Sequence, residues 1–461
     1  MFSAPYHFYR PFTRATMVLT VFALGIIGST QNALLTVRIA FGSLVILALL
    51  RYQFALLISW VLINAFIGSS LSIFNGNNLL SGLTIPTILL LFALPTKRNF
   101  QRMRALPFLL LYVLWILLGI GISPLSTSEF AVAWTLLLAY VAVSVLTISV
   151  ITTPQRLLRL IDVSMVPSIF IAFYGIYGYF SQQNGVFDPS RGFFRIGSIF
   201  GNSPPTLAMF LSIMIPLTIY RTVTLQGWKQ LIGIVLISLF LVTLGLTYSR
   251  GPLIFVPLSV IVMAIFWPSR KLKASMFGML AFTLVIAVNT PIFGRFFNQD
   301  FSTLNGRTYL WQAVLDHFDP AQLLGHGLQS SDQLLLNLKV GVGFGVIATA
   351  THNIFLEVLY DHGLIGLTLL LLTFVTLAVT LMTKWRVATK EHRMIIATTL
   401  AIFCSVIGQS FESNDLWNQA IGIYFWIAMA LPFALCWSQS PQSAMIACSN
   451  KKMQIVPSEV G

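Results

Sequence analysis

Long apolar runs, separated by short polar segments, make up most of the chain. We identify fourteen runs that are long enough to cross a bilayer as helices. They are residues 15–31, 33–50, 53–73, 78–95, 105–121, 130–150, 162–181, 204–221, 230–248, 252–268, 274–290, 353–383, 394–411 and 417–437. Because the first two are short and nearly continuous, and Arg38 lies inside the second, twelve spans also fit the pattern. The runs do not alternate polar and apolar residues, so they do not predict the strands of an outer-membrane barrel.

Composition supports the same assignment. The chain has 461 residues, of which 57% are hydrophobic and only 9% are charged, and its mean hydropathy is +0.85. A helix bundle can expose that much apolar surface to lipid, whereas a soluble domain cannot expose it to water. We therefore predict an all-α fold, a polytopic membrane helix bundle of 12–14 spans with one large extracytoplasmic loop that contains short helices. The basic N-terminus resembles a signal peptide, but it shows no clear cleavage site, so we expect an uncleaved first helix.

The basic residues, which give the chain a formal net charge of +14, are unevenly distributed. Most lie in alternate connections between the runs, which is the pattern of the positive-inside rule. We therefore expect both termini in the cytoplasm, and we do not expect a nucleic-acid partner. A minority falls on the outer side, namely Arg191, Arg195, Arg250, Arg295, Arg307 and Lys339. Because the bias drives basic residues inward, their presence outside needs a reason, and an anionic ligand is one such reason.

Two outer connections are longer than a simple turn, residues 181–205 and residues 291–351. In the longer one, an apolar helical face is predicted from Tyr309, Trp311, Val314, Leu315 and Phe318. This pattern predicts a folded loop that lies on the membrane surface. The predicted organisation is a transmembrane bundle over residues 1–290, the large extracytoplasmic loop over 291–351, C-terminal transmembrane helices over 352–440 and a cytoplasmic tail over 441–461.

Four outer segments combine Arg or His with turn-forming residues. They are RGFFRIGSIFGNSPP from Arg191, TYSRG around Arg250, NGRTYLW around Arg307 and THNIFLEVLYDHG around His352. Arginine stays charged and binds phosphate through two donors, so these side chains suit a diphosphate. Histidine is well suited to accept a proton near neutral pH. Since arginines can supply the positive charge, the pattern requires neither a metal nor another cofactor.

Simpler interpretations exist for each residue taken alone. An arginine at a helix end commonly extends to lipid headgroups, and a histidine at a helix start commonly caps the helix. Asn353, Glu357 and Asp361 are spaced by four residues, so they share one helical face. They either support chemistry or line a hydrogen-bonded seam between helices. The combination of several arginines with one histidine favours a shared site.

The order of these motifs resembles the O-antigen ligase and O-antigen polymerase family of bacterial membrane proteins. The similarity runs from about Arg191 to Gly366, and includes RIGSIFGN, TYSRG, GRTYLW followed by LLGHG, and the spacing from His352 to Gly363. It implies a metal-independent glycosyltransferase of the cytoplasmic (inner) membrane that works on the outer face. The implied donor is a glycan on a lipid carrier, usually undecaprenyl diphosphate. The implied acceptor is the lipid A core of lipopolysaccharide, another lipid-linked glycan or a protein.

Carried over by position, the resemblance makes His352 the base and makes Arg195, Arg250 and Arg307, together with Arg191, the ligands of the diphosphate. Supporting roles are expected for Asn202, Asn353, Glu357 and Asp361. The sequence departs from the family in two places. Asn202 is followed by Ser-Pro-Pro where the family usually continues Pro-Asn, and Leu310 follows Arg307 one residue early. Ligase and polymerase activity both stay open.

Two other functions fit parts of the pattern. A transporter of an anion or a lipid-linked sugar would use embedded charges along a permeation path, for which Arg38, Glu357, Glu412 and Asp415 are suited. A structural scaffold of an envelope complex would tolerate substitution of the outer arginines and His352. We favour the glycosyltransferase because it uses the arginines and the histidine together.

Overall fold

The computed structural model describes residues 53–54, 57–58, 61–62, 101–183, 185–188, 193–197, 203–270, 273, 276–278, 306–339 and 350–435. The apolar runs predicted between residue 105 and residue 268, and those after residue 353, are helices. These are α6 (Leu106–Leu118), α7 (Thr127–Val150), α8 (Pro154–Ser181), α9 (Pro204–Thr224), α10 (Trp228–Leu246), α11 (Arg250–Phe266), α16 (Ile354–Val387), α17 (Lys390–Gln409) and α18 (Gln419–Leu435). The other predicted runs lie outside the described residues, apart from isolated positions.

Six of these helices, α7 to α10, α16 and α17, are long and apolar enough to cross a membrane, and α6, α11 and α18 are shorter apolar helices. The chain is therefore an all-α polytopic membrane protein. One small element was not predicted: β1 (Gly185–Asp188) pairs with β2 (Phe193–Ile196) as an antiparallel hairpin, with Val186 opposite Arg195. Four-residue strands are too short to show a reliable alternating pattern in the sequence.

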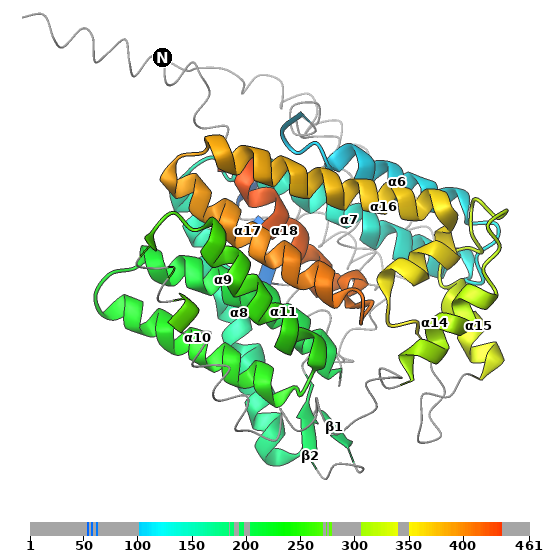
Figure 1. The fold of residues 1–461 in the computed structure, drawn as a ribbon, viewed down its shortest axis with the longest axis horizontal. Coiled ribbons are helices and arrows are strands. Elements are labelled where there is room, and N and C mark those ends of the chain that lie inside the picture. The colour runs from blue at the N-terminus through cyan, green and yellow to red at the C-terminus, as the bar shows by residue number, and fades with distance from the viewer. Residues whose placement is uncertain are drawn as a thin grey trace, which may run out of the picture.

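The helices form two groups that α17 joins. α6, α7, α16 and α18 lie together, α8 to α11 lie together, and α17 runs between them (Figure 1). α9 is apolar on all sides and almost entirely buried, because it is the central helix of its group. α10 buries few residues and exposes side chains such as Leu231 and Val235, as a lipid-facing helix should.

Basic residues gather at one end of the bundle. Arg221, in the last turn of α9, donates to both carboxylate oxygens of Asp162 on α8. Lys384 and Arg386 lie in the last turn of α16, and Lys390 is the first residue of α17. The opposite end of the bundle, where α9 and α11 begin and α17 ends, holds the cavity described below.

The large loop contains two short helices, α14 (Arg307–Asp316) and α15 (Ser330–Leu338), which lie beside the first part of α16 (Figure 1). A small core formed by Leu310, Val314, Leu335 and Tyr360 holds them there. The predicted apolar face of α14 is wrong in part, since Tyr309 is 60% exposed and Leu315 is 47% exposed. The buried face is the stripe of Leu310 and Val314, one turn apart, because α15 and α16 pack against that side.

α16 is broken at Gly363, whose φ of 69° and ψ of −174° are not helical. The break frees backbone carbonyls that must find other donors within the protein. His326 N–H donates to the Tyr360 carbonyl (3.0 Å), and Gly327 N–H donates to the Asp361 carbonyl (2.9 Å). Trp115 Nε1 of α6 donates to the His362 carbonyl (3.0 Å). The loop segment LLGHG, residues 323–327, therefore binds the broken turn of α16, and we call this attachment the clasp.

Candidate active site

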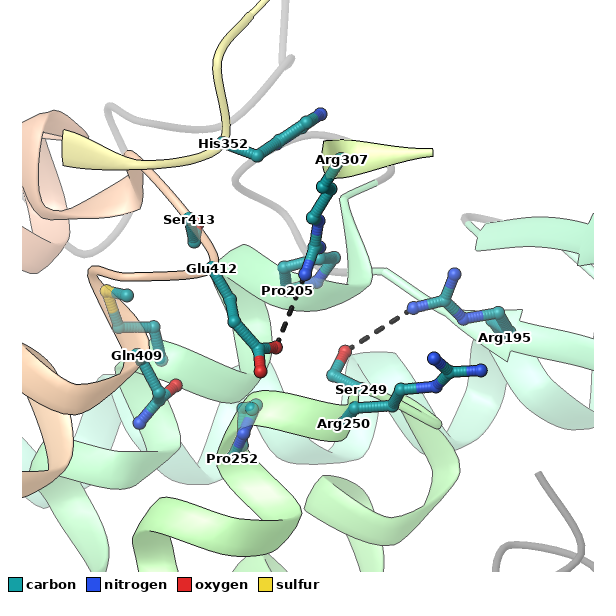
Figure 2. A pocket seen from close by; sticks show the side chains of 12 residues that line it. Arg195, Pro205, Ser249, Arg250, Pro252, Arg307, His352, Gln409, Glu412 and Ser413 are labelled. Carbon is teal, nitrogen blue, oxygen red and sulfur yellow. Dashed lines mark hydrogen bonds and ion pairs between the residues drawn. The ribbon is translucent and has the colours of Figure 1, made fainter. Parts of the chain in front are cut away.

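A cavity of about 240 Å³ lies at the end of the bundle where α9 and α11 begin and α17 ends. Its lining is Arg195, Pro205, Met209, Ser249, Arg250, Gly251, Pro252, Arg307, His352, Gln409, Glu412 and Ser413. Figure 2 shows these side chains converging from the hairpin, from the large loop and from the ends of several helices. The cavity is smaller than the ~300–1,000 Å³ of sites that enclose drug-sized ligands, so it suits a head group rather than a whole lipid-linked glycan.

Arg195 reaches the cavity from β2, the second strand of the hairpin. Its Nε donates to the Thr247 carbonyl at 3.1 Å, just after the last residue of α10. A second donor, Nη2, lies 3.5 Å from the hydroxyl of Ser249, which precedes α11 (Figure 2). The hairpin is thus tied to the turn between α10 and α11, and Arg250, the first residue of α11, enters the same cavity from that turn.

Arg307 is the first residue of α14 and follows Gly306, which caps that helix in a left-handed conformation. Its side chain extends between His352 and Glu412 (Figure 2), and its Nη1 lies 3.3 Å from Glu412 Oε2. Glu412 belongs to the turn after α17, where its N–H donates to the Gln409 carbonyl (2.8 Å). Both side chains of this ion pair are largely shielded, with 22% and 25% exposed.

His352 immediately precedes the N-cap of α16 and has a left-handed φ of 51°. That conformation is uncommon for a residue other than glycine, and its neighbours hold it in place. The Asn353 side chain accepts hydrogen bonds from Phe355 N–H and Leu356 N–H. Ile354 N–H donates to the Ser410 carbonyl (3.0 Å), which joins this turn to the one that carries Glu412.

The imidazole of His352 is neutral at physiological pH. Burial, and to a smaller extent the positive charge of Arg307, together lower its pKa from 6.5 to about 4. A neutral imidazole has a lone pair that can accept a proton. The cavity therefore combines a cationic lining, which can bind an anion, with a group that can act as a base.

The structure brings together four of the predicted site residues, Arg195, Arg250, Arg307 and His352. Arg191 and Asn202, like Arg38, lie outside the described residues. The roles assigned to all of these residues stay predictions.

The predicted supporting residues on α16 do not line the cavity. Asn353 is the N-cap of α16. Asp361 is 1% exposed and accepts hydrogen bonds from Gln329 N–H (2.7 Å) and Ser331 N–H (2.8 Å), so it fixes the large loop. Trp311 of α14 donates from Nε1 to the Thr351 carbonyl (3.2 Å), so its side chain helps to hold α14 against the residues just before α16.

Glu412 is the site residue that sequence reasoning assigned elsewhere, to the permeation path of the alternative transporter. The signal that would have found it is its place directly after an apolar span, on the same side as the outer arginines. Asp415 lies behind the cavity, where it accepts a hydrogen bond from the Thr206 hydroxyl (2.6 Å) and one from the Ser413 hydroxyl. Burial raises the pKa of Asp415.

Comparison with known proteins agrees with the motifs. The family model described as O-antigen ligase matches residues 233–371, which include Arg250, Arg307 and His352. The exopolysaccharide production protein ExoQ of Rhizobium meliloti (strain 1021) is 35% identical over 120 residues. That alignment covers 23% of this chain and 27% of ExoQ, so it spans about a quarter of the relative. The predicted resemblance to the O-antigen ligase family is thus confirmed.

Proposed function

From the membership of residues 233–371 in the O-antigen ligase family, we propose that this protein is a membrane glycosyltransferase for a polyprenyl-diphosphate-linked glycan. The glycan moves from this carrier to an acceptor hydroxyl on a lipid, another glycan or a protein. The observation that carries the proposal is the meeting of Arg195, Arg250, Arg307 and His352 in one cavity. The name of ExoQ, an exopolysaccharide production protein, fits the same class of chemistry.

The arginines bind the diphosphate of the donor. Each guanidinium offers several N–H donors to phosphate oxygens and keeps its charge at any working pH. The polyprenyl tail of the donor stays in the bilayer, and the glycan extends away from it. Because the cavity is small, it fixes the diphosphate and leaves the sugar that follows it near His352.

His352 accepts the proton of the acceptor hydroxyl. That oxygen attacks the anomeric carbon, the bond from this carbon to the diphosphate oxygen breaks, and the electron pair of that bond leaves with the polyprenyl diphosphate. A single displacement of this kind inverts the configuration at the anomeric carbon. Bound diphosphate offsets the charge of Arg307, which raises the pKa of His352 and makes the imidazole a better base once the donor is in place.

The arginines stabilise the transition state more than the ground state. Negative charge grows on the diphosphate as the glycosidic bond breaks, so the same guanidinium groups interact more strongly with it. We propose a metal-independent reaction because these groups supply the charge stabilisation that a divalent cation would otherwise supply.

The reaction takes place on the outer face of the cytoplasmic membrane in this proposal. The positive-inside rule supports that orientation, since the basic end of the bundle, with Arg221, Lys384 and Lys390, is opposite the cavity. The termini would then lie in the cytoplasm and residues 291–351 outside.

The test is the His352→Ala variant. We expect glycan transfer in membranes or proteoliposomes, without any ion gradient, to fall by about 10²–10⁴-fold, because general-base catalysis contributes about that much. His317→Ala is the control, since His317 is exposed and does not line the cavity. Wild-type transfer by the His352→Ala variant would remove the proposed base, and transfer that depends on a gradient would favour the transporter.

A further inference from the structure

The cavity contains a negative charge where the proposed function needs only positive ones. Among the residues that the structure describes, its lining has three arginines and one glutamate, Glu412. Glu412 lies beside Arg307 and also beside the first turn of α11, because a Cβ on Gly251 would lie only 3.1 Å from Glu412 Oε2. The first turn of a helix favours an anion, and so does a guanidinium. Glu412 therefore occupies an environment that would suit a phosphate.

The neighbours of Glu412 hold it there. The Gln409 side chain, one turn earlier, donates to the hydroxyls of Ser212 (2.8 Å) and Ser405 (3.0 Å) and lines the cavity too. Glycine at 251 leaves the space that the carboxylate fills. Gln409 thus anchors the end of α17 to α9, and the Glu412 carboxylate, which belongs to the turn that follows, lies against Gly251 of α11.

We propose that Glu412 is a positioning residue that holds Arg307 and offsets one of the three guanidinium charges, so that the cavity releases the diphosphate product. The inference rests on the proposed function. A donor glycan on a polyprenyl diphosphate is a diphosphate diester with two negative charges. The product is a monoester, whose terminal phosphate has a further ionisation with a pKa of about 6. Without Glu412, the surplus positive charge would hold the more negative product too tightly.

The same charge count applies during the reaction. When His352 takes the proton of the acceptor, the lining gains one positive charge as the leaving diphosphate gains one negative charge. Once the imidazolium passes its proton on to the product or to water, the lining returns to its original charge and attraction to the product weakens. Glu412 thus makes tight binding coincide with the transition state and not with the product state.

The experiment measures binding of undecaprenyl diphosphate and of its methyl ester to the full chain in nanodiscs at about pH 8. The first probe is the monoester and the second is a diester. In Glu412→Gln we expect the monoester to bind at least about tenfold tighter than in wild type, and the diester to gain less. Glu412→Asp keeps the charge and should behave like wild type. Glu391→Gln, an exposed carboxylate at the other end of α17, is the matched charge control.

Kinetics give a second measurement that loss of structure would not imitate. Glu412→Gln should lower KM for the lipid-linked donor and also lower kcat, because product release becomes slower. Equal or weaker binding of both probes by Glu412→Gln would overturn the inference, since the carboxylate would then only hold Arg307 in place. Failure of wild type to bind either probe would instead refute the proposed donor class, and this inference with it.

Discussion

Substitution of Gly363 by alanine tests how the large loop is attached to the membrane bundle. Gly363 breaks α16 at a φ of 69°, in a region that is almost restricted to glycine. A Cβ there would lie 2.2 Å from the Leu323 carbonyl oxygen and 2.7 Å from Gly325 N. Both contacts are with backbone, so no side-chain rotation relieves them. The clasp must therefore open or α16 must change its path.

The cost follows from the geometry. A residue held in such a backbone conformation costs about 1–3 kcal/mol. Opening the clasp also loses the hydrogen bonds to the Tyr360 and Asp361 carbonyls, each contributing about 1 kcal/mol. We therefore expect Gly363→Ala to destabilise the attachment of the loop by about 3–5 kcal/mol. Because α14 carries Arg307, the site should lose its shape while the transmembrane helices stay folded.

The assay is limited proteolysis and hydrogen exchange of residues 306–339 in detergent, together with glycan transfer. We expect faster cleavage in the loop, faster exchange of His326 and Gly327 amides, and little transfer. Gly121→Ala is the matched control, because nothing lies within 4 Å of a Cβ at that position. Wild-type protection of the loop and wild-type transfer in Gly363→Ala would refute the clasp.

Three further predictions concern the pH dependence of activity, the pH dependence of stability and the basic end of the bundle. Protonated His352 cannot act as a base, so kcat/KM should fall as pH falls through about 4, well below the ordinary histidine pKa of 6.5. A limb near pH 6.5 in the pH profile would contradict this assignment. The same lowered pKa means that stability is retained above pH 6.5 and is progressively lost as pH falls from 6.5 towards 4, which acid-dependent melting in detergent would measure. Asp162→Asn removes a partly exposed ion pair with Arg221, so we expect a loss of about 1 kcal/mol in stability with unchanged diphosphate binding; a change in binding would link that end of the bundle to the site.

Much of the fold was predictable because apolar runs must be helices in lipid. The bounds of most of these helices differ from the predicted runs by a few residues, whereas α8 begins at Pro154 and not at residue 162, because the polar residues of its first turns are helical too. The hairpin was missed because it is short, and the face of α14 was misread because its largest apolar residues are not its buried ones. The break in α16 at Gly363 leaves only a weak trace in the sequence, since a single glycine inside an apolar run is common in membrane helices.

Of the predicted site residues, Arg195, Arg250, Arg307 and His352 line the cavity, but their arrangement could not be predicted. His352 and the arginines could be selected because charge is costly near lipid and is kept there for a reason. Glu412 was assigned to a permeation path instead of to this site, because its ion pair with Arg307 joins residues far apart in the chain. Likewise, only the structure separates Asp361, which fixes the loop, from the residues that line the cavity.

The sequence by itself determined the membrane class, most helix positions, the uneven distribution of charge and the choice of Arg195, Arg250, Arg307 and His352 as site candidates. These properties depend on local composition and on transfer from water to lipid, which each segment experiences separately. The tertiary structure decided which charges meet, which carboxylate offsets them and which residues hold the large loop on α16. Those outcomes depend on contacts between distant segments, such as Arg307 with Glu412 and Gly327 with Asp361, whose geometry exists only after the helices have packed.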